Sequence, residues 1–472
     1  MIFTIYKEEQ ELLQTIGKAA QDLGYPAYVV GGFVRDRLLG RESKDLDVVC
    51  VGSGVKLAEE LTKHLRPRPR LTVYKRFGTA CIKHQGVEIE FVGARKESYR
   101  SDSRKPIVEK GTLTDDQNRR DFTINALAVS LNEHDFGTIT DPFDGLKDLR
   151  DKIIRTPLEP GQTFSDDPLR MMRAIRFAAQ LGFKIEDKTL ASIEKNRRRI
   201  HIVSTERITT ELNKVILSPI PSVGFHLLYE TGLLKIIFPE MADLQGIETR
   251  GGKAHKDNFY HTLEVLDNLA FRSMDLWLRW SAILHDIAKP ATKRYDQRAG
   301  WSFHGHEALG ATWVPKIFRR MRLPLDYKMK YVQKMVRLHQ RPICLSREEI
   351  TDSAIRRLLF DAGDDIEDLM LLCESDITSK NRDRVERYLE NYQLVRQKIK
   401  EVEEADHIRN WQPPISGEDI MKEFDMRPCR EVGMIKDAIR EAILDGLIPN
   451  EREAAWAYML EQADKLGLQS PS

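Results

Sequence analysis

The stretch that decides the fold is Gly31-Gly32-Phe33-Val34-Arg35-Asp36-Arg37-Leu38-Leu39-Gly40, with Lys44-Asp45-Leu46-Asp47-Val48-Val49 following shortly after. The β-branched run at residues 28–30 predicts a strand that leads into the glycine pair. Two adjacent glycines predict a turn at which the backbone approaches another group closely. Residues 33–39 have helical spacing and end at a glycine, and residues 45–49 predict a second strand. The stretch therefore predicts a strand, a turn, a short helix and a second strand.

Asp45 and Asp47 lie two positions apart on the second predicted strand. Because alternate side chains of a strand share a face, the two carboxylates project together. The free N–H groups of the glycine turn, at the start of a helix, suit phosphate, and Arg35 is placed to neutralise phosphate charge. Paired carboxylates are oxygen ligands for Mg²⁺, and two such ions can clamp the reacting oxygens of a nucleotidyl transfer.

The whole string resembles a motif of the class II polynucleotide polymerases, which comprise the tRNA nucleotidyltransferases (CCA-adding enzymes) and the bacterial poly(A) polymerases. The family pattern is Gly-Gly-x-Val-Arg-Asp-x-Leu-Leu-Gly, four residues and Asp-x-Asp, with the spacing found here. The resemblance implies that Asp45 and Asp47 are catalytic and bind Mg²⁺. It also implies that Gly31, Gly32 and Arg35 bind the nucleotide.

Composition is typical of a globular chain, with 41% hydrophobic and 31% charged residues among 472. The net charge of +1 excludes a global polyanion-binding character, so any RNA binding must use local basic patches, such as residues 66–70, Arg197-Arg198-Arg199 or Arg319-Arg320-Met321-Arg322. Each of these alone is more often a solvated face. Five scattered cysteines without pairing or zinc-type spacing favour a reducing compartment. The N-terminus lacks signal-peptide features, and no apolar run is long enough for a membrane. We therefore expect a cytoplasmic protein.

A third head carboxylate is predicted at Glu90, on a strand over residues 87–92. In the family an acid, usually Asp, stands five residues before an Arg, and Arg95 points back to Glu90 in this way. The resemblance implies a metal ligand here, and a structural acid on the sheet is the alternative. The polar residues 98–118 have no periodicity and predict a mobile loop.

The string Arg119-Arg120-Asp121-Phe122-Thr123-Ile124-Asn125-Ala126-Leu127 resembles the second motif of the family. Arginine suits a triphosphate because its planar fork bonds phosphate oxygens in pairs and keeps its charge. The resemblance implies nucleotide binding by Arg120, with Asp121 and Asn125 as weaker candidates.

Residues 164–177 predict one helix, in which Asp167, Arg170, Arg173 and Arg176 recur every third position. A surface ladder of ion pairs would have the same pattern. The string also resembles the Glu-Asp-x-x-Arg element with which the family reads the incoming base, although Asp166 stands where Glu is usual. A carboxylate and a guanidinium complement the amino donor and ring-nitrogen acceptor that cytosine and adenine share. The resemblance assigns base reading to Asp167 and Arg170, and nucleotide binding to all four residues.

A second site is predicted from histidines, six of which fall between His255 and His339. His261 opens one predicted helix, and His285-Asp286 lies on another over residues 276–288. Further along are Phe303-His304-Gly305-His306-Glu307, then Arg337-Leu338-His339, then Asp376. The set resembles the HD phosphohydrolase domain, which implies metal ligands at His261, His285, Asp286, His306 and Asp376. Imidazole with carboxylate suits Mn²⁺, Ni²⁺, Fe or Zn²⁺. Such a domain is either active or retained as a scaffold.

These motifs predict an α+β chain with an N-terminal mixed α/β nucleotidyltransferase head followed by all-α neck, HD and tail domains. The expected boundaries are 1–150 for the head, 151–250 for the neck, 251–380 for the HD domain and 381–472 for a tRNA-binding tail. The predicted activity is template-independent addition of CCA to tRNA from CTP and ATP. An A-adding enzyme or a poly(A) polymerase shares every head motif, and a metal-dependent HD phosphohydrolase is the alternative of another class. The oligomeric state is left open.

Overall fold

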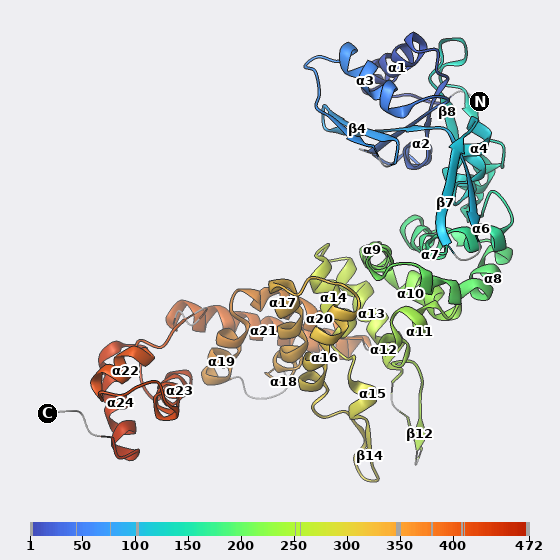
Figure 1. Ribbon diagram of the computed structural model, residues 1–472. Coiled ribbons are helices and arrows are strands. Elements are labelled where there is room, and N and C mark those ends of the chain that lie inside the picture. The colour runs from blue at the N-terminus through green and yellow to red at the C-terminus, as the bar shows by residue number, and fades with distance from the viewer. Residues whose placement is uncertain are drawn as a thin grey trace. The chain divides into compact units, whose positions relative to one another are not determined.

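The structure is a computed structural model that describes residues 3–468, apart from Lys44, Arg76, 101–102, Gly251, His255, 346–350, 379–380, 407–408 and Asn410. The chain forms two compact units that divide between Pro239 and Glu240 (Figure 1). No helix within the described ranges has both the length and the apolar character needed to cross a membrane.

The first unit begins with a mixed seven-stranded sheet in the order β3-β4-β5-β2-β1-β8-β9. The central strand β2 pairs in parallel with β5 and antiparallel with β1. This arrangement confirms the predicted mixed α/β head. The strands are β1 (Ala27–Val30), β2 (Asp45–Cys50), β3 (Leu71–Tyr74), β4 (Thr79–His84), β5 (Val87–Gly93), β8 (Ala128–Ser130) and β9 (Ile139–Thr140).

Helices α1 (Lys7–Asp22) and α3 (Gly54–His64) pack against each other beside the sheet (Figure 1). The side chain of Ser53 accepts the Lys56 N–H and starts α3. Leu57 and Leu61 of α3 are fully buried. Gly54 allows the close approach, because a Cβ there would lie 2.8 Å from the backbone of Phe91 in β5. The short helix α2 (Gly32–Leu38) follows β1 directly.

The region predicted as a mobile loop is instead ordered, so that prediction is wrong for its described residues. β6 (Arg95–Arg100) and β7 (Ser103–Lys110) form an antiparallel hairpin, and α4 (Leu113–Asn118) follows. A reciprocal capping box between Thr112 and Asp115 starts this helix. Backbone pairing and a cap thus order a segment whose polar composition indicates a loop.

The rest of the first unit is helical, and its α7 packs against α9 and α10. The prediction of one helix over residues 164–177 is wrong, because α6 ends at Asp166 and α7 starts at Leu169. Pro168 disfavours a helical conformation at Asp167, which is extended. The helices are α5 (Gly145–Asp151), α6 (Pro160–Asp166), α7 (Leu169–Leu181), α8 (Asp187–Asn196), α9 (Thr205–Ile216), α10 (Pro221–Glu230) and α11 (Leu233–Ile237), with 3₁₀ turns η1 (Thr123–Asn125), η2 (Glu133–Asp135) and η3 (Arg197–Ile202).

The second unit is a helical assembly in which α13, α14, α17 and α20 pack together. The predicted helix 276–288 is too long, because α14 ends at Leu284 and His285-Asp286 lies in the turn that follows. The helices are α12 (Pro239–Ala242), which starts at the boundary, α13 (Asn258–Ala270), α14 (Leu276–Leu284), α15 (Lys289–Thr292), α16 (His306–Arg320), α17 (Tyr327–Leu338), α18 (Arg341–Leu345), α19 (Asp352–Ala362), α20 (Ile366–Ser375), α21 (Arg382–Asp406), α22 (Gly417–Glu423), α23 (Arg430–Leu444) and α24 (Arg452–Lys465), with the turn η4 (Gly363–Asp365).

Three small strand pairs interrupt the helical part that the sequence predicts after the head. They pair short extended segments at the ends of loops and add no layer to the fold. They are β10 (Ile153–Ile154) with β11 (Lys184–Ile185), β12 (Thr249–Arg250) with β13 (Lys253–Ala254), and β14 (Arg294–Asp296) with β15 (Gly300–Ser302). The predicted helical character of this region is otherwise confirmed.

The close approach of α3 to β5 gives a testable expectation for Gly54→Ala. The added Cβ meets rigid backbone at 2.8 Å, so α3 has to shift, at a cost of about 1–3 kcal/mol in unfolding free energy. Gly433→Ala in α23 is the control, because nothing lies within 4 Å of its Cβ position and alanine favours a helix. Urea unfolding followed by circular dichroism measures both. Equal stability of Gly54→Ala and wild type would contradict the packing described.

Candidate functional sites

The first candidate site is built on the parallel pairing of β2 with β5. In this register Asp45 lies beside Glu88 and Asp47 beside Glu90. Asp45 is exposed and Asp47 half-buried. The pKa of Asp47 is raised, chiefly because burial disfavours its charged form; Arg120 opposes the rise and Asp45 adds to it. The pKa of Glu90 is raised by burial and by the charge of Asp47. The sheet thus holds like charges close together.

This excess of negative charge fits a divalent cation, and oxygen ligands of this kind suit Mg²⁺. Asp45 and Asp47 share a face of β2, as the sequence predicts. Within the described residues, the carboxylate oxygens of Asp45, Asp47 and Glu90 do not all lie within 4.8 Å of one another. The two aspartates therefore form the core of the candidate cation site, and the role of Glu90 stays a prediction.

The glycine turn lies directly beside the carboxylate of Asp47. Gly31 has φ of +75°, a conformation that favours glycine. A Cβ at Gly31 would lie 3.1 Å from Oδ2 of Asp47 and 3.2 Å from Nη1 of Arg120. The missing side chain therefore leaves room beside both a carboxylate and a guanidinium, at the start of α2.

Arg120 is held in place by Asp116, a residue that the sequence analysis did not single out. Asp116 is fully buried, and its Oδ2 accepts hydrogen bonds from Nε and Nη2 of Arg120 at 3.1 and 2.9 Å. Its other oxygen accepts from Nε of Arg119 at 2.9 Å. The spacing of three and four residues to these arginines is the sequence signal that would have identified it.

A chain of polar contacts connects α2 to α7. Nη1 of Arg35 donates to Oδ1 of Asn125 at 2.8 Å, and Nδ2 of Asn125 donates to Oδ1 of Asp121 at 2.9 Å. Asp121 then pairs with Nη2 of Arg173 at 2.6 Å. Burial acts to raise the pKa of Asp121, but Arg173 and Asn125 outweigh it and lower that pKa to about 2. Asp121 is therefore a buried anion.

Phe177 of α7 lies among three arginines. The guanidinium carbons of Arg176, Arg35 and Arg173 lie 4.1, 4.8 and 5.4 Å from its ring centroid. Arg176 also pairs with Glu211 of α9 at 3.0 Å. Burial lowers the pKa of Arg176 to about 10, with Glu211 acting against this and Arg173 adding to it. Four of the five predicted nucleotide-binding arginines are thus already paired with acids of the protein, namely Arg35, Arg120, Arg173 and Arg176.

Asp167 and Arg170, the predicted base-reading pair, make separate contacts. Oδ1 of Asp167 accepts the Leu169 N–H at 3.2 Å, and its Oδ2 lies 3.9 Å from Nη2 of Arg207. Nη2 of Arg170 donates to the carbonyl of Arg119 at 2.5 Å. Arg170 thereby joins α7 to the second motif, next to Arg120.

The second candidate site gathers histidines around the carboxylate of Asp286. Oδ2 of Asp286 lies 3.5 Å from Nε2 of His261 and 3.2 Å from Nε2 of His285. Its Oδ1 lies 3.2 Å from Nε2 of His306 and 3.8 Å from Nε2 of His339. Both sets of three have donor atoms within 4.8 Å of one another and are buried. A single carboxylate is therefore shared by two histidine pairs.

The cluster unites all five predicted ligands and adds His339, which the sequence analysis named without proposing it as a ligand. Asp376, the distant acid, lies 2.8 Å from Nε2 of His261 and 3.7 Å from Nε2 of His285. Nζ of Lys289 lies 2.5 Å from Oδ2 of Asp286. His339 ends α17, and only its place among the other histidines could have indicated a role.

The histidine rings are oriented as metal ligands are. Nδ1 of His285, His306 and His339 each lies 2.7 Å from a backbone carbonyl, which leaves Nε2 directed at Asp286. Nε2 of His285 is buried and, although it lies 3.2 Å from Oδ2 of Asp286, it makes no hydrogen bond of regular geometry within the described residues. Burial and the charge of His285 lower the pKa of His339 to about 3, so it is neutral. Burial acts to lower the pKa of His285, but the charges of Asp286 and Asp376 outweigh it and raise that pKa, so a metal ion that binds neutral His285 would displace its proton. Imidazole nitrogens together with carboxylates are donors that fit a transition-metal ion.

Known protein families match successive segments of the chain, with the two candidate sites in different matches. The poly A polymerase head domain matches residues 27–155, the probable RNA and SrmB-binding site of polymerase A matches 182–244, and the HD domain matches 258–377. A multifunctional CCA protein of Nitrosococcus oceani is 33% identical over 368 residues, 75% of this chain and 85% of that protein.

Two further comparisons bear on the head and on the fold. An A-adding tRNA nucleotidyltransferase of Aquifex aeolicus is 47% identical over 163 residues, which are 34% of this chain and 19% of that protein. The crystal structure of the Bacillus stearothermophilus CCA-adding enzyme in complex with CTP has a TM-score of 0.66 and 25% identity, over 98% of this chain and 99% of that one.

The buried ion pair of the head gives a prediction for Arg173→Met. Removing the guanidinium leaves Asp121 buried without its main partner, which costs about 3 kcal/mol of unfolding free energy at neutral pH. Because the folded-state pKa of about 2 lies below 3.8, this stabilisation is present above about pH 4 and is lost as pH falls toward 2.

Urea unfolding at several pH values measures this effect, with the exposed Arg319→Met as the matched control. We expect the two variants to differ strongly at pH 7 and to converge in acid. Equal stability of the two at pH 7 would show that the ion pair contributes nothing.

Proposed function

The chain belongs to the family of multifunctional CCA proteins, and on that premise we propose that it adds CCA to the 3′ ends of tRNA from CTP and ATP without a template. The observation that carries this proposal is that Oδ2 of Asp47 and Nη1 of Arg120 both lie beside the Gly31 turn, 3.1 and 3.2 Å from the position that a Cβ there would take. This arrangement brings together carboxylates that suit a cation, an arginine that suits a triphosphate, and a glycine turn whose lack of side chains leaves room for both.

In the proposed reaction the terminal ribose hydroxyl of the RNA attacks the α-phosphorus of the nucleotide. A bond forms from that oxygen to phosphorus, its proton passes to solvent, the bond to the β-phosphate oxygen breaks, and pyrophosphate leaves. Asp45 and Asp47 would hold Mg²⁺, which would supply charge stabilisation to the reacting oxygens. Arg120 and the N–H groups of the Gly31-Gly32 turn orient the triphosphate.

We assign base selection to Asp167 and Arg170. Cytosine and adenine both present an amino donor beside a ring-nitrogen acceptor, which a carboxylate and a guanidinium satisfy. Uracil and guanine present the reverse pattern and would leave polar groups unpaired. Arg170 already reaches Arg119, the neighbour of Arg120, which supports a role beside the nucleotide. An A-adding enzyme or a poly(A) polymerase would use the same residues, and a requirement for CTP separates those activities from CCA addition.

The four domains proposed from the sequence are the head (1–150), the neck (151–250), the HD domain (251–380) and the tail (381–472). We propose that the neck and tail hold tRNA, and that the protein acts in the cytoplasm, where tRNA is processed. The neck contains basic residues, and the RNA-binding family element matches it over residues 182–244. Both observations support RNA binding by the neck.

A second activity, phosphohydrolysis, is proposed for the histidine cluster. His261, His285, Asp286 and Asp376 would hold a Mn²⁺, Ni²⁺, Fe or Zn²⁺ ion, and His306 and His339 lie beside the other oxygen of Asp286. Such an ion supplies Lewis acidity toward a phosphate ester. The observation that favours this activity is the buried Nε2 of His285, which makes no hydrogen bond of regular geometry within the described residues.

For nucleotidyl transfer we expect Asp45→Ala and Asp47→Ala each to lower CMP incorporation into tRNA by roughly a thousandfold or more, because cation binding contributes several kcal/mol. Glu88→Ala is the matched control, since Glu88 lies beside Asp45 in the register but is exposed and paired with Lys83. The rate of labelled CMP addition is measured with saturating Mg²⁺. Normal addition by the Asp47 variant would refute the proposed site.

For base selection, Asp167→Ala and Arg170→Ala should allow UMP and GMP to be added, so that discrimination against UTP and GTP falls by about tenfold or more. Arg207→Ala is the control. Nη2 of Arg207 lies near Oδ2 of Asp167, at 3.9 Å, but Arg207 is not assigned to the base. Relative kcat/KM values for the four nucleotides are compared. An equal loss of rate for all four nucleotides would make the pair structural.

For the histidine cluster, His285→Ala combined with Asp286→Ala should abolish binding of Mn²⁺ or Ni²⁺ and hydrolysis of a phosphomonoester or 2′,3′-cyclic phosphate. Asp376→Ala should match it, whereas His304→Ala, an exposed neighbour outside the cluster, should retain both properties. Calorimetric titration with metal and phosphate release are measured. CCA addition should continue at a near-normal rate in the double variant.

Two results would contradict this partition of functions. Absence of both metal binding and hydrolysis in the wild type would make the HD domain a scaffold. Loss of CCA addition in the folded double variant would show that the two sites are coupled.

A further inference from the structure

The second unit carries a concentration of positive charge that the proposed activities do not use. Residues 316–341 contain nine lysine and arginine residues and a single acid, Asp326, in a chain whose net charge is +1. The segment covers the end of α16 and all of α17. A local basic stretch in a nearly neutral protein is the electrostatic signature of a surface that meets a polyanion.

Several of these cations have no acid to neutralise them. Arg320 pairs with Glu240, and Lys334 with Asp365. Lys316, Arg319, Lys330 and Arg337, by contrast, are exposed and form no ion pair within the described part of the chain. A surface ladder of ion pairs therefore does not account for the segment.

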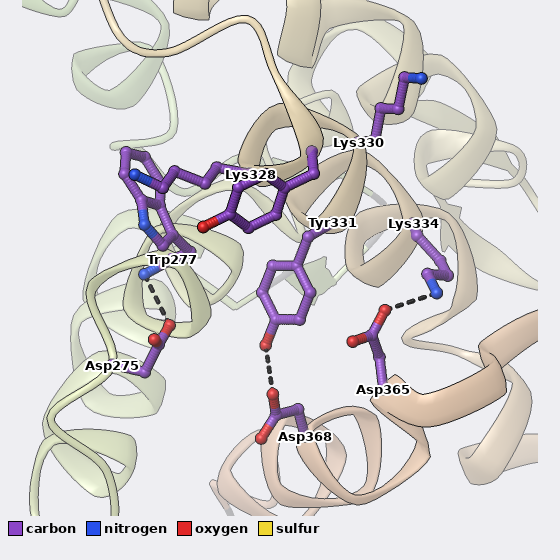
Figure 2. Close-up of a pocket in the computed structure, with 9 residues that line it drawn as sticks. Asp275, Trp277, Lys328, Lys330, Tyr331, Lys334, Asp365 and Asp368 are labelled. Atoms are coloured by element: carbon purple, nitrogen blue, oxygen red, sulfur yellow. Dashed lines mark hydrogen bonds and ion pairs between the residues drawn. The ribbon is translucent and has the colours of Figure 1, made fainter.

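A cavity of about 570 Å³ opens on this surface between the first turn of α14, one face of α17 and the start of α20. Its lining combines the aromatic rings of Trp277, Tyr327 and Tyr331 with lysines and aspartates. Figure 2 shows Trp277 and Lys328 on one side of Tyr331 and the pair of Lys334 with Asp365 on the other. None of the lining residues belongs to the histidine cluster.

The aromatic lining is held in place by contacts within the protein. The Trp277 ring packs against buried Phe318, with centroids 6.0 Å apart. The hydroxyl of Tyr331 donates to Oδ2 of Asp368 at 2.7 Å. The Lys328 ammonium lies 5.4 Å from the Trp277 centroid and 5.7 Å from that of Tyr327. Such fixed rings lose little entropy when a flat ligand stacks on them.

Tyr327 is the clearest unexplained residue of the cavity. It is 72% exposed, although its ring faces a cavity with a second aromatic residue. Large exposed aromatic side chains next to cations are characteristic of stacking platforms for unpaired bases. Aspartates such as Asp275 and Asp368 add acceptors for base amino groups or ribose hydroxyls.

We propose that this cavity binds one unstacked nucleotide of single-stranded RNA, with its base on Trp277 and Tyr327 and its phosphates on Lys328 and Lys330. The ligand chemistry, a base with an attached phosphate, is shared by free nucleotides and RNA. RNA is the assigned source because the unpaired cations continue past the cavity to Arg319 and Arg337, farther than one nucleotide requires.

Photo-crosslinking in the full chain tests this assignment. A short oligoadenylate containing 8-azidoadenosine is irradiated with the protein, and the modified peptides are identified by mass spectrometry. A parallel reaction uses 8-azido-ATP. Labelling of Trp277 or of the 327–331 segment by the oligonucleotide is expected. The peptides of the head are mapped separately, so failure of the proposed nucleotidyl transfer leaves this result readable.

Matched variants define what the cavity recognises. Tyr327→Ala and Lys330→Ala should each weaken oligonucleotide binding, measured by fluorescence anisotropy, by about five- to tenfold. Tyr327→Phe keeps the ring and Lys330→Arg keeps the charge, so both should bind like the wild type. Because both residues are exposed, we expect the alanine variants to fold as the wild type does, which circular dichroism checks.

Three outcomes would overturn the proposal. The first is no labelling of α14 or α17 by either probe. The second is labelling by 8-azido-ATP alone, which would make the cavity a free-nucleotide site. The third is equal loss of binding in Tyr327→Ala and Tyr327→Phe, which would exclude stacking.

Discussion

The parallel register between β2 and β5 is the constraint on which the head depends. It fixes Asp47 beside Glu90 and Asp45 beside Glu88, so that four acids stand on two adjacent strands. A sheet cannot relax this repulsion without breaking its backbone pairing. The positive charge of Arg120, which buried Asp116 holds in position, offsets part of this repulsion. The turn at Gly31 leaves space beside Asp47. A divalent cation would complete the compensation and could in turn bind a triphosphate, which is why we propose nucleotidyl transfer at this site.

In the histidine cluster, a buried carboxylate is stabilised by nitrogen groups. Asp286 is buried among imidazoles whose orientation is set by hydrogen bonds to the backbone, and Lys289 lies against one of its oxygens. The pKa of Asp286 is lowered despite burial, because His285 and Lys289 stabilise its charge. Nitrogen donors in place of carboxylates change the preferred metal from Mg²⁺ to a transition ion. The two sites thus differ in ligand chemistry, which makes separate activities in one chain physically reasonable.

Sequence patterns predicted what depends on local spacing. Asp45 and Asp47 share a face because a strand alternates, and the turn at Gly31 follows from the glycine pair. The ordered set of histidines likewise converges as its resemblance to the HD domain implies.

The sequence-based predictions that failed concern features that depend on partners elsewhere in the chain or on a single residue. The hairpin of β6 and β7 arises from pairing that polar composition does not reveal, and Pro168 divides a pattern that is helical on both sides. His339 was missed because its role comes from residues that the fold brings to it, whereas Asp116 holds arginines three and four residues away, a local spacing that the sequence analysis did not use. The most direct test of the account is to sequence the 3′ ends that the purified protein produces from a tRNA lacking CCA, with CTP and ATP supplied together. The account predicts addition of C, C and A followed by a stop, whereas ends extended by A alone would contradict it.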